Sequence, residues 1–141
     1  MFRRIDEHIS VTPQITADMI DAIKAAGFVA IINNRPDEEE AGQPDGAAIR
    51  AAAEAAGLAY AAIPVTHAGF SHAQIDAMND ALDAAGGPVL AYCRSGTRST
   101  YLWALARAKA GHDPAIIAES AAGAGYDIGP IRPMIEALAA R

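Results

Sequence analysis

The chain has 141 residues, of which 52% are hydrophobic and 20% are charged, and its formal net charge is −6. This composition is typical of a globular chain with a single core and excludes an intrinsically disordered one. The acidic balance argues against general nucleic-acid binding, and no apolar run approaches the ~20 residues of a membrane span. We therefore expect one domain over residues 1–141, no nucleic-acid or membrane partner, no signal peptide and a cytoplasmic location.

Short apolar runs alternate with longer helical patterns along the chain. They predict, in order, a strand at 8–11, a helix at 16–27, a strand at 28–33, a surface loop at 34–46, a helix at 45–57, a strand at 58–65, a helix at 71–87 that opens with a Ser71–Gln74 capping box, a strand at 88–92, a helix at 98–111 and terminal helices within 113–125 and 129–141. Strand–helix–strand alternation implies right-handed crossovers. The predicted fold class is α/β, with a mostly parallel sheet of four to five strands flanked by helices.

The stretch VLAYCRSGTRST, residues 89–100, contains the most informative pattern. It places Cys93 at the end of a buried strand and just before a helix, and ligands of open parallel sheets bind at this edge. The free N–H groups of a helix start attract anions and favour the thiolate form of a cysteine, and Gly96 allows the backbone to turn its amides inward. Arg94 and Arg98 add planar donors for an oxyanion. The pattern predicts an anion cradle with a nucleophile at its base, and the alternative is a buried structural cysteine beside two solvated arginines.

Cys93 is the only cysteine, so it cannot form an internal disulfide. The four histidines do not combine with it at the spacing of a zinc site. We therefore expect neither a metal nor another cofactor.

Three segments carry a resemblance to known families: INNRPDEEEAGQP, YAAIPV and YCRSGTRS followed by LWALARA. CRSGTR is similar to the six-residue loop of rhodanese-like sulfurtransferases, whose cysteine carries a persulfide. It also resembles the phosphate loop of tyrosine and dual-specificity phosphatases, but it is one residue shorter, and Ser99 stands where that pattern has arginine. Over residues 2–110 the chain resembles the phosphatase-like domain of bacterial β-lactamase hydrolase-like proteins, which occurs alone or fused to persulfide dioxygenases. This resemblance implies a dual-specificity-phosphatase-like architecture, and members of the family have been called both phosphatases and sulfur transferases.

Two departures from the phosphatase pattern lead us to predict a sulfurtransferase, which carries sulfane sulfur as a persulfide on Cys93. The loop is short, and the place of the phosphatase general acid, an Asp, reads Thr66-His67-Ala68. The expected substrates are thiosulfate or a small persulfide, with a persulfide dioxygenase as a partner. The alternatives are a phosphatase that acts on phosphorylated substrates through a phosphocysteine, with His67 as acid or as an ordinary loop residue, and a non-catalytic anion-binding module.

Further candidate site residues surround the cysteine. Arg98 is the better candidate for facing the anion because it opens the helix, and Ser99 is predicted either to hydrogen-bond the thiolate or to cap the helix. The loop at 34–46 follows the second predicted strand, so it should lie at the same sheet edge and contact substrate or orient the cysteine loop. We expect its acidic run, 38–40, to be solvated. The predicted anion-binding residues are Arg94, Ser95, Gly96, Thr97, Asn34, Arg35 and Asp37.

Overall fold

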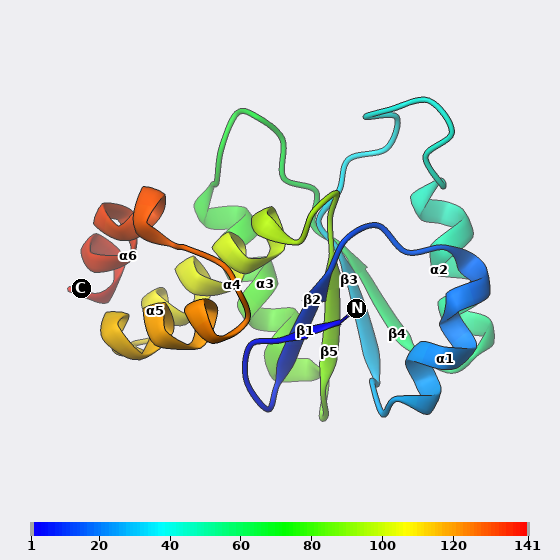
Figure 1. Ribbon diagram of the computed structural model, residues 1–141, viewed down its shortest axis with the longest axis horizontal. Coiled ribbons are helices and arrows are strands. Elements are labelled where there is room, and N and C mark those ends of the chain that lie inside the picture. The colour runs from blue at the N-terminus through cyan, green and yellow to red at the C-terminus, as the bar shows by residue number, and fades with distance from the viewer. Residues whose placement is uncertain (1, 141) are drawn as a thin grey trace.

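The computed structural model describes residues 2–140 and contains a five-stranded sheet (Figure 1). The strand order is β1-β2-β5-β3-β4, and only β1 runs antiparallel to its neighbour. The predicted α/β fold with a mostly parallel sheet is therefore confirmed. The strands are β1 (Arg3–Arg4), β2 (Ile9–Thr12), β3 (Ala30–Asn33), β4 (Ala59–Ala62) and β5 (Val89–Tyr92).

Helices cover both faces of the sheet (Figure 1). Helices α1 and α2 lie on one side, and α3 to α6 lie on the other. The helical elements are η1 (Ala17–Met19), α1 (Ile20–Ala25), α2 (Gly46–Ala55), α3 (His72–Ala84), α4 (Thr97–Lys109), α5 (Pro114–Gly123), η2 (Gly129–Ile131) and α6 (Arg132–Ala139).

Most element boundaries fall within a few residues of the predicted ones. Helix α3 opens with the predicted capping box, in which the Ser71 side chain accepts from the Gln74 amide and the Gln74 side chain accepts from Ser71. Strand β1 was not predicted, because two exposed arginines carry no apolar pattern and pair only through the tertiary fold. The predicted last helix reached residue 141, which lies outside the described residues.

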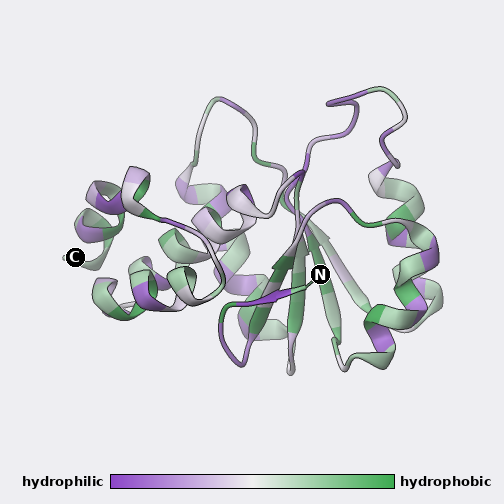
Figure 2. Ribbon diagram, in the orientation of Figure 1, coloured by the Kyte–Doolittle hydropathy of each residue, from purple (hydrophilic) through white to green (hydrophobic). Residues whose placement is uncertain are grey.

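The core is divided between the two faces of the sheet. In Figure 2 the parallel strands are mostly green, whereas β1, which consists of two arginines, is purple. Along β5, Val89 and Ala91 pack in the cluster that contains residues of α3 and α4, whereas Leu90 and Tyr92 pack in the cluster that contains residues of α1 and α2. This alternation follows from the two-residue period of a strand. A strand covered on both faces reads as a continuous apolar run, and this is why VLAY predicted a buried strand.

The carboxyl ends of the parallel strands meet at one edge, at the top of Figure 1. Asn33 pairs with Tyr92 in the β3–β5 register, so the segments that follow these two residues leave the sheet side by side. Three connections gather at this edge: residues 34–45, residues 63–71 and the loop between β5 and α4. Among the described residues, no helix has both the length and the apolarity needed to cross a bilayer.

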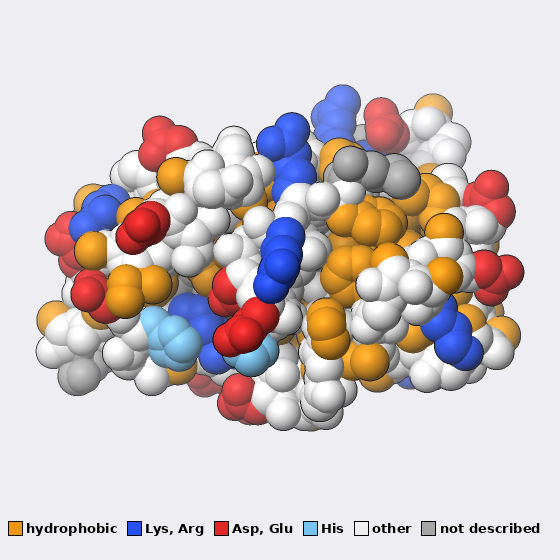
Figure 3. All heavy atoms as spheres, turned by 60° about the horizontal axis from the view of Figure 1, so that its bottom comes forward, with side chains coloured by type: hydrophobic (Ala, Val, Ile, Leu, Met, Phe, Trp, Pro, Cys, Tyr) orange, Lys and Arg blue, Asp and Glu red, His pale blue; other side chains and the backbone are white. Residues whose placement is uncertain are grey.

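The opposite edge carries a separate hollow, which Figure 3 turns toward the viewer with its histidines in pale blue. A cavity of about 470 Å³ opens there at the amino ends of β2 and β5. Both signs of charge line it, so it has no evident preference for an anion. Its titratable lining residues are Asp6, His8, Asp83, Arg107 and His112.

Candidate active site

The loop between β5 and α4 holds Cys93 beneath its own backbone amides. Cys93 is fully buried, and the Gly96 N–H donates to its Sγ over 3.1 Å. Gly96 has a φ of +91°, a conformation that favours glycine, and it precedes the first residue of α4. The sequence therefore predicted the turn correctly, and the turn places one backbone N–H, that of Gly96, against the sulfur.

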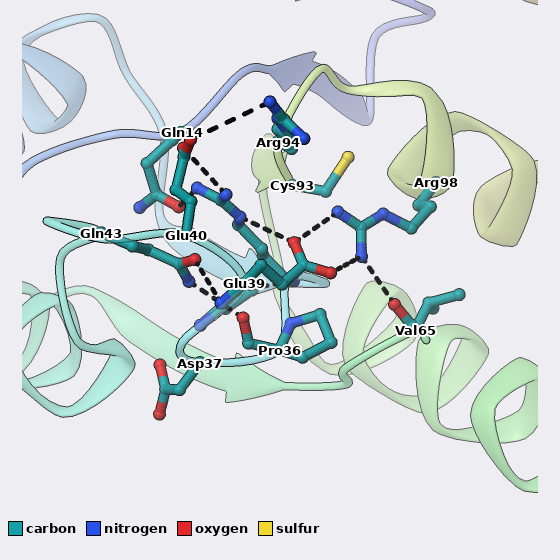
Figure 4. A network of polar contacts seen from close by, with 12 residues as sticks. Gln14, Pro36, Asp37, Glu39, Glu40, Gln43, Val65, Cys93, Arg94 and Arg98 are labelled. Carbon is teal, nitrogen blue, oxygen red and sulfur yellow. Dashed lines mark hydrogen bonds and ion pairs between the residues drawn. The ribbon is translucent and has the colours of Figure 1, made fainter. Parts of the chain in front are cut away.

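Arg98 extends from the first turn of α4, and both terminal nitrogens of its guanidinium donate hydrogen bonds. Its Nη1 donates to Glu39 Oε2 (2.7 Å) and to the Val65 carbonyl (2.8 Å), and its Nη2 donates to Glu39 Oε1 (2.8 Å). Figure 4 shows this fork facing the carboxylate, with the sulfur of Cys93 between the side chains of Arg94 and Arg98 in that view. The guanidinium of Arg98 is thus held in one orientation near Cys93 by Glu39 and Val65.

Electrostatics in the network follow from this pairing. Hydrogen bonds from Arg98, and then from Arg35, lower the pKa of Glu39 from 4.5 to about 2 against the opposing effect of burial. The hydrogen bonds to Glu39 raise the pKa of Arg98, burial opposes this, and the interaction with the nearby Cys93 adds to the rise. Glu39 is therefore ionised across the physiological range.

Arg35 supports the ion pair between Glu39 and Arg98 through its own hydrogen bond to Glu39. Its side chain is 1% exposed, and it donates to Glu39 (2.8 Å), Glu40 (3.0 Å) and Gln14 (3.1 Å). We predicted that Arg35 either contacts substrate or orients the cysteine loop. All three of its guanidinium nitrogens donate to protein side chains, so the orienting role fits better. The expectation that the whole acidic run is solvated is wrong for Glu39, whose side chain is only 19% exposed. Nothing in the local sequence distinguishes it from the exposed Glu38, because only the tertiary fold brings Arg98 to it.

Arg94 takes a different orientation from Arg98. Its side chain is 68% exposed, and its nearest acidic partner is Glu40 at 3.9 Å. Of the two loop arginines, Arg98 is the one that faces the inner network, as its position at the helix start had suggested.

Asn34 and Asp37 lie around the site without facing the sulfur. Asn34 is fully buried, donates from its side chain to the Ile63 carbonyl and receives no partner at Oδ1 among residues 2–140. Asp37 accepts from the backbone N–H of Gly46, at the start of α2. Both residues hold the framework that carries the loops, and substrate contact by either stays a prediction.

The remaining loop residues fall into an exposed and a buried group. Ser95 and Thr97 form a hydrogen bond between their hydroxyls (3.0 Å) near the surface. Ser99 is fully buried, and its Oγ has no hydrogen-bond partner within residues 2–140. Its predicted bond to the thiolate is not among the contacts of this structure and stays a prediction for the reacting state.

His67 lies in the exposed connection between β4 and α3, at the same sheet edge. It makes no hydrogen bond within the described part of the chain, although the neighbouring Ala68 N–H donates to Thr66 Oγ1 (3.1 Å). The role of His67 as an acid therefore stays a prediction. No group of three or more His, Cys, Asp or Glu side chains in residues 2–140 is arranged to hold a metal ion.

The mostly parallel sheet, flanked by helices on both faces, and the cysteine loop that joins β5 to α4 give the chain a phosphatase-like α/β fold. The chain belongs to the family described as the beta-lactamase hydrolase-like protein, phosphatase-like domain, whose model matches residues 1–110. The suspected family is therefore confirmed.

Similarity to individual proteins agrees with the family. A "Beta-lactamase hydrolase-like protein" of Agrobacterium fabrum is 40% identical over 105 residues, which are 74% of this chain and 24% of that protein. The chain thus spans about a quarter of the length of the curated relatives it matches. The crystal structure of a "putative phosphatase" from Neisseria meningitidis superposes with a TM-score of 0.82 at 35% identity and covers 96% of both chains.

A more distant structure shares the fold. TpbA of P. aeruginosa, solved as a cysteine-to-serine variant in complex with phosphotyrosine, has a TM-score of 0.66 at 18% identity and covers 99% of this chain and 88% of that one. These comparisons favour the phosphatase alternative over our preferred prediction of sulfur transfer, for which they give no support.

Proposed function

We propose that this chain is a cysteine-dependent phosphatase in which Cys93 attacks the phosphorus atom of a phosphate monoester. The observation that carries the proposal is the joint position of the Gly96 amide and the Arg98 fork around a buried sulfur. Membership in a phosphatase-like family supports it, as does a structural neighbour that binds phosphotyrosine. Phosphorylated substrates are the corresponding substrate class.

The side edge of Arg98, which the hydrogen bonds to Glu39 and the Val65 carbonyl do not use, suits an oxyanion. A guanidinium has five N–H groups, and three of those of Arg98 are used by Glu39 and the Val65 carbonyl. The remaining two, on Nε and Nη2, form the side edge that binds phosphate through two parallel hydrogen bonds. Glu39 therefore positions the fork for a phosphoryl group without occupying this edge.

The reaction proceeds in two displacements. The thiolate of Cys93 forms a bond to phosphorus while the bond from phosphorus to the leaving oxygen breaks, and that oxygen takes a proton. A water molecule then attacks the phosphocysteine, the sulfur–phosphorus bond breaks, and inorganic phosphate departs as the thiolate is restored. Charge on the equatorial oxygens is stabilised throughout by the loop amides and Arg98.

The proton for the leaving oxygen does not come from Glu39. With a pKa of about 2, its carboxyl carries no proton to give near neutrality. His67 is the proposed donor, because it lies in the connection where phosphatases carry their acid. Activated aryl phosphates, whose leaving groups need little protonation, are then the best first substrates.

Hydrolysis of p-nitrophenyl phosphate by the wild-type chain and by Cys93→Ser tests this function. We expect turnover by the wild type only, and a wild-type intermediate heavier by one phosphoryl group after rapid acid quench. No turnover from acidic to neutral pH, with the protein folded and Cys93 reduced, contradicts the proposal.

Sulfur transfer is the second candidate because of one observation, the six-residue span from Cys93 to Arg98. A shorter ring makes a tighter cradle, which suits a sulfane sulfur better than a tetrahedral phosphoryl group. The thiolate would attack the outer sulfur of thiosulfate, sulfite would leave, and the persulfide would pass its sulfur to a second thiol, with a persulfide dioxygenase as a partner. Incubation with thiosulfate distinguishes the two: the sulfurtransferase gains one sulfur atom on Cys93, and the phosphatase gains none. Absence of both products in a chain that still binds oxyanions would favour a binding module.

A further inference from the structure

Tyr126 contacts the cysteine loop from outside the segment that the family model matches. It follows α5, beyond residue 110, and its hydroxyl donates to the Ser95 carbonyl over 3.0 Å. Burial raises the pKa of Tyr126 although Arg3 opposes the rise, so the hydroxyl keeps the proton that it donates.

The carbonyl of Ser95 and the N–H of Gly96 belong to one peptide group. In a trans peptide these two groups point in opposite directions. Tyr126 binds the outer end of this group, and Cys93 Sγ receives its inner end over 3.1 Å. The hydroxyl, the peptide and the sulfur therefore form one chain of hydrogen bonds, in which each bond polarises the next.

Glycine makes this peptide easy to turn, because Gly96 populates both signs of φ with little strain. A turned peptide would aim the Ser95 carbonyl oxygen at the thiolate and at any bound oxyanion, and both are negative. Replacing Gly96 by a residue with a side chain cannot restrict the rotation of this peptide, because the Cβ would collide with the Tyr126 hydroxyl. The loop thus needs an external contact to keep its amide turned inward.

Tyr126 is itself clamped by the first strand. The Arg3 guanidinium lies 5.6 Å from the centre of the Tyr126 ring, and its Nη1 donates to the Ala124 carbonyl over 3.1 Å. Gly125 lets the two segments approach, because a Cβ there would meet Arg3. Arg3 in β1 therefore holds the segment after α5, and Tyr126 in that segment contacts the cysteine loop.

We propose that Tyr126 is a positioning residue that locks the Ser95–Gly96 peptide with its N–H toward Cys93, and that Arg3 holds Tyr126 in place. The inference rests on the proposed role of Cys93 as the nucleophile. It does not depend on whether phosphorus or sulfur is transferred, because both reactions need a thiolate and an anion cradle.

The test is Tyr126→Phe, with Tyr101→Phe as the matched control. The hydroxyl of Tyr101 also donates to a backbone carbonyl in the segment after α5, that of Asp127 (3.2 Å). This hydrogen bond does not involve the cysteine loop. The readouts are the pH profile of Cys93 alkylation by iodoacetamide and the affinity for orthovanadate. Neither needs turnover, so failure of the proposed function and failure of this inference are distinguishable.

We expect Tyr126→Phe to move the midpoint of the alkylation profile to higher pH and to weaken vanadate binding about fivefold, the size expected for one hydrogen bond. Tyr101→Phe should change neither. Equal behaviour of the two variants, or an unchanged profile in Tyr126→Phe, overturns the inference. Should Tyr126→Phe not fold, Arg3→Gln decides in its place, with a smaller shift in the same direction expected and no shift overturning it.

Discussion

Two connections flank the cysteine at the same sheet edge, and they are held very differently. Residues 34–45 are tied down by Arg35, by Gln43, which donates to the Pro36 carbonyl, and by Glu39, which reaches Arg98. Residues 66–71 are exposed along most of their length, and His67 makes no hydrogen bond within the described chain. The structure therefore fixes the half of the site to which we assign anion binding, while the half to which we assign the leaving group is not preorganised. Reaction class depends on that second half, and this explains why anion chemistry is easier to infer here than the reaction itself.

The largest effect should come from breaking the fixed half at Arg98. Arg98→Lys keeps the charge but loses the fork that binds both Glu39 oxygens, so we expect kcat/KM for p-nitrophenyl phosphate to fall by about 10²- to 10³-fold. Arg94→Lys is the control, since its side chain is 68% exposed and ends 3.9 Å from Glu40. It should stay within about threefold of wild type. An Arg98→Lys variant that also stays within about threefold of wild type would show that charge alone, without the fork, supports the reaction.

The same contrast separates what the sequence could predict from what it could not. The four parallel strands and the cysteine turn could be predicted because they rest on local patterns, apolar runs and a glycine before a helix. The choice of Arg98 over Arg94 rested on a position at the helix start, and which of them binds an anion stays a prediction. Glu39 and Tyr126 were missed because their contacts join segments that are 59 and 31 residues apart along the chain. No spacing rule connects such residues, since only the packed fold brings them together.

The preference for sulfur transfer has a related cause. It rested on the length of one loop and on the absence of an Asp near His67, both of which describe parts of the site rather than the whole. The family, which matches residues 1–110, and the fold, which a "putative phosphatase" shares over 96% of the chain, favour the phosphatase alternative instead. A motif that two reaction classes share can therefore place the nucleophile without deciding what it attacks.

The loose half of the site is tested by varying the leaving group. His67→Ala should leave p-nitrophenyl phosphate hydrolysis within about threefold of wild type and should slow phenyl phosphate hydrolysis by about 10²-fold, because only the poorer leaving group needs a positioned acid. His72→Ala, a change at a nearby histidine that contacts Lys109, serves as the control. Equal effects on both substrates would remove His67 from the mechanism and would leave water as the proton donor.

The smallest effect should come from Glu39, which joins the rigid loop to Arg98. We expect Glu39→Gln to lower kcat/KM by about tenfold or less, because the amide still accepts one hydrogen bond but no longer fixes both nitrogens of the fork. Glu40→Gln is the control, since the Glu40 side chain is 49% exposed and makes no hydrogen bond to Arg98. A variant more active than wild type would mean that the carboxylate competes with the substrate oxyanion for Arg98.

The pH dependence of stability provides an independent measure of this contact. Because folding lowers the pKa of Glu39 from 4.5 to about 2, its stabilising effect is complete above pH 4.5 and is lost as the pH falls toward 2. The shift sets a ceiling of about 3 kcal/mol, and partial exposure brings the expected value to about 1–2 kcal/mol. In urea unfolding at pH 7, the free energy of unfolding of the wild type should exceed that of Glu39→Gln by this amount. The difference should shrink below pH 4.5 and vanish as the pH approaches 2. A difference that persists undiminished at low pH would mean that the substitution acts through packing, and that the rigidity of the anion-binding half does not depend on the charge of Glu39.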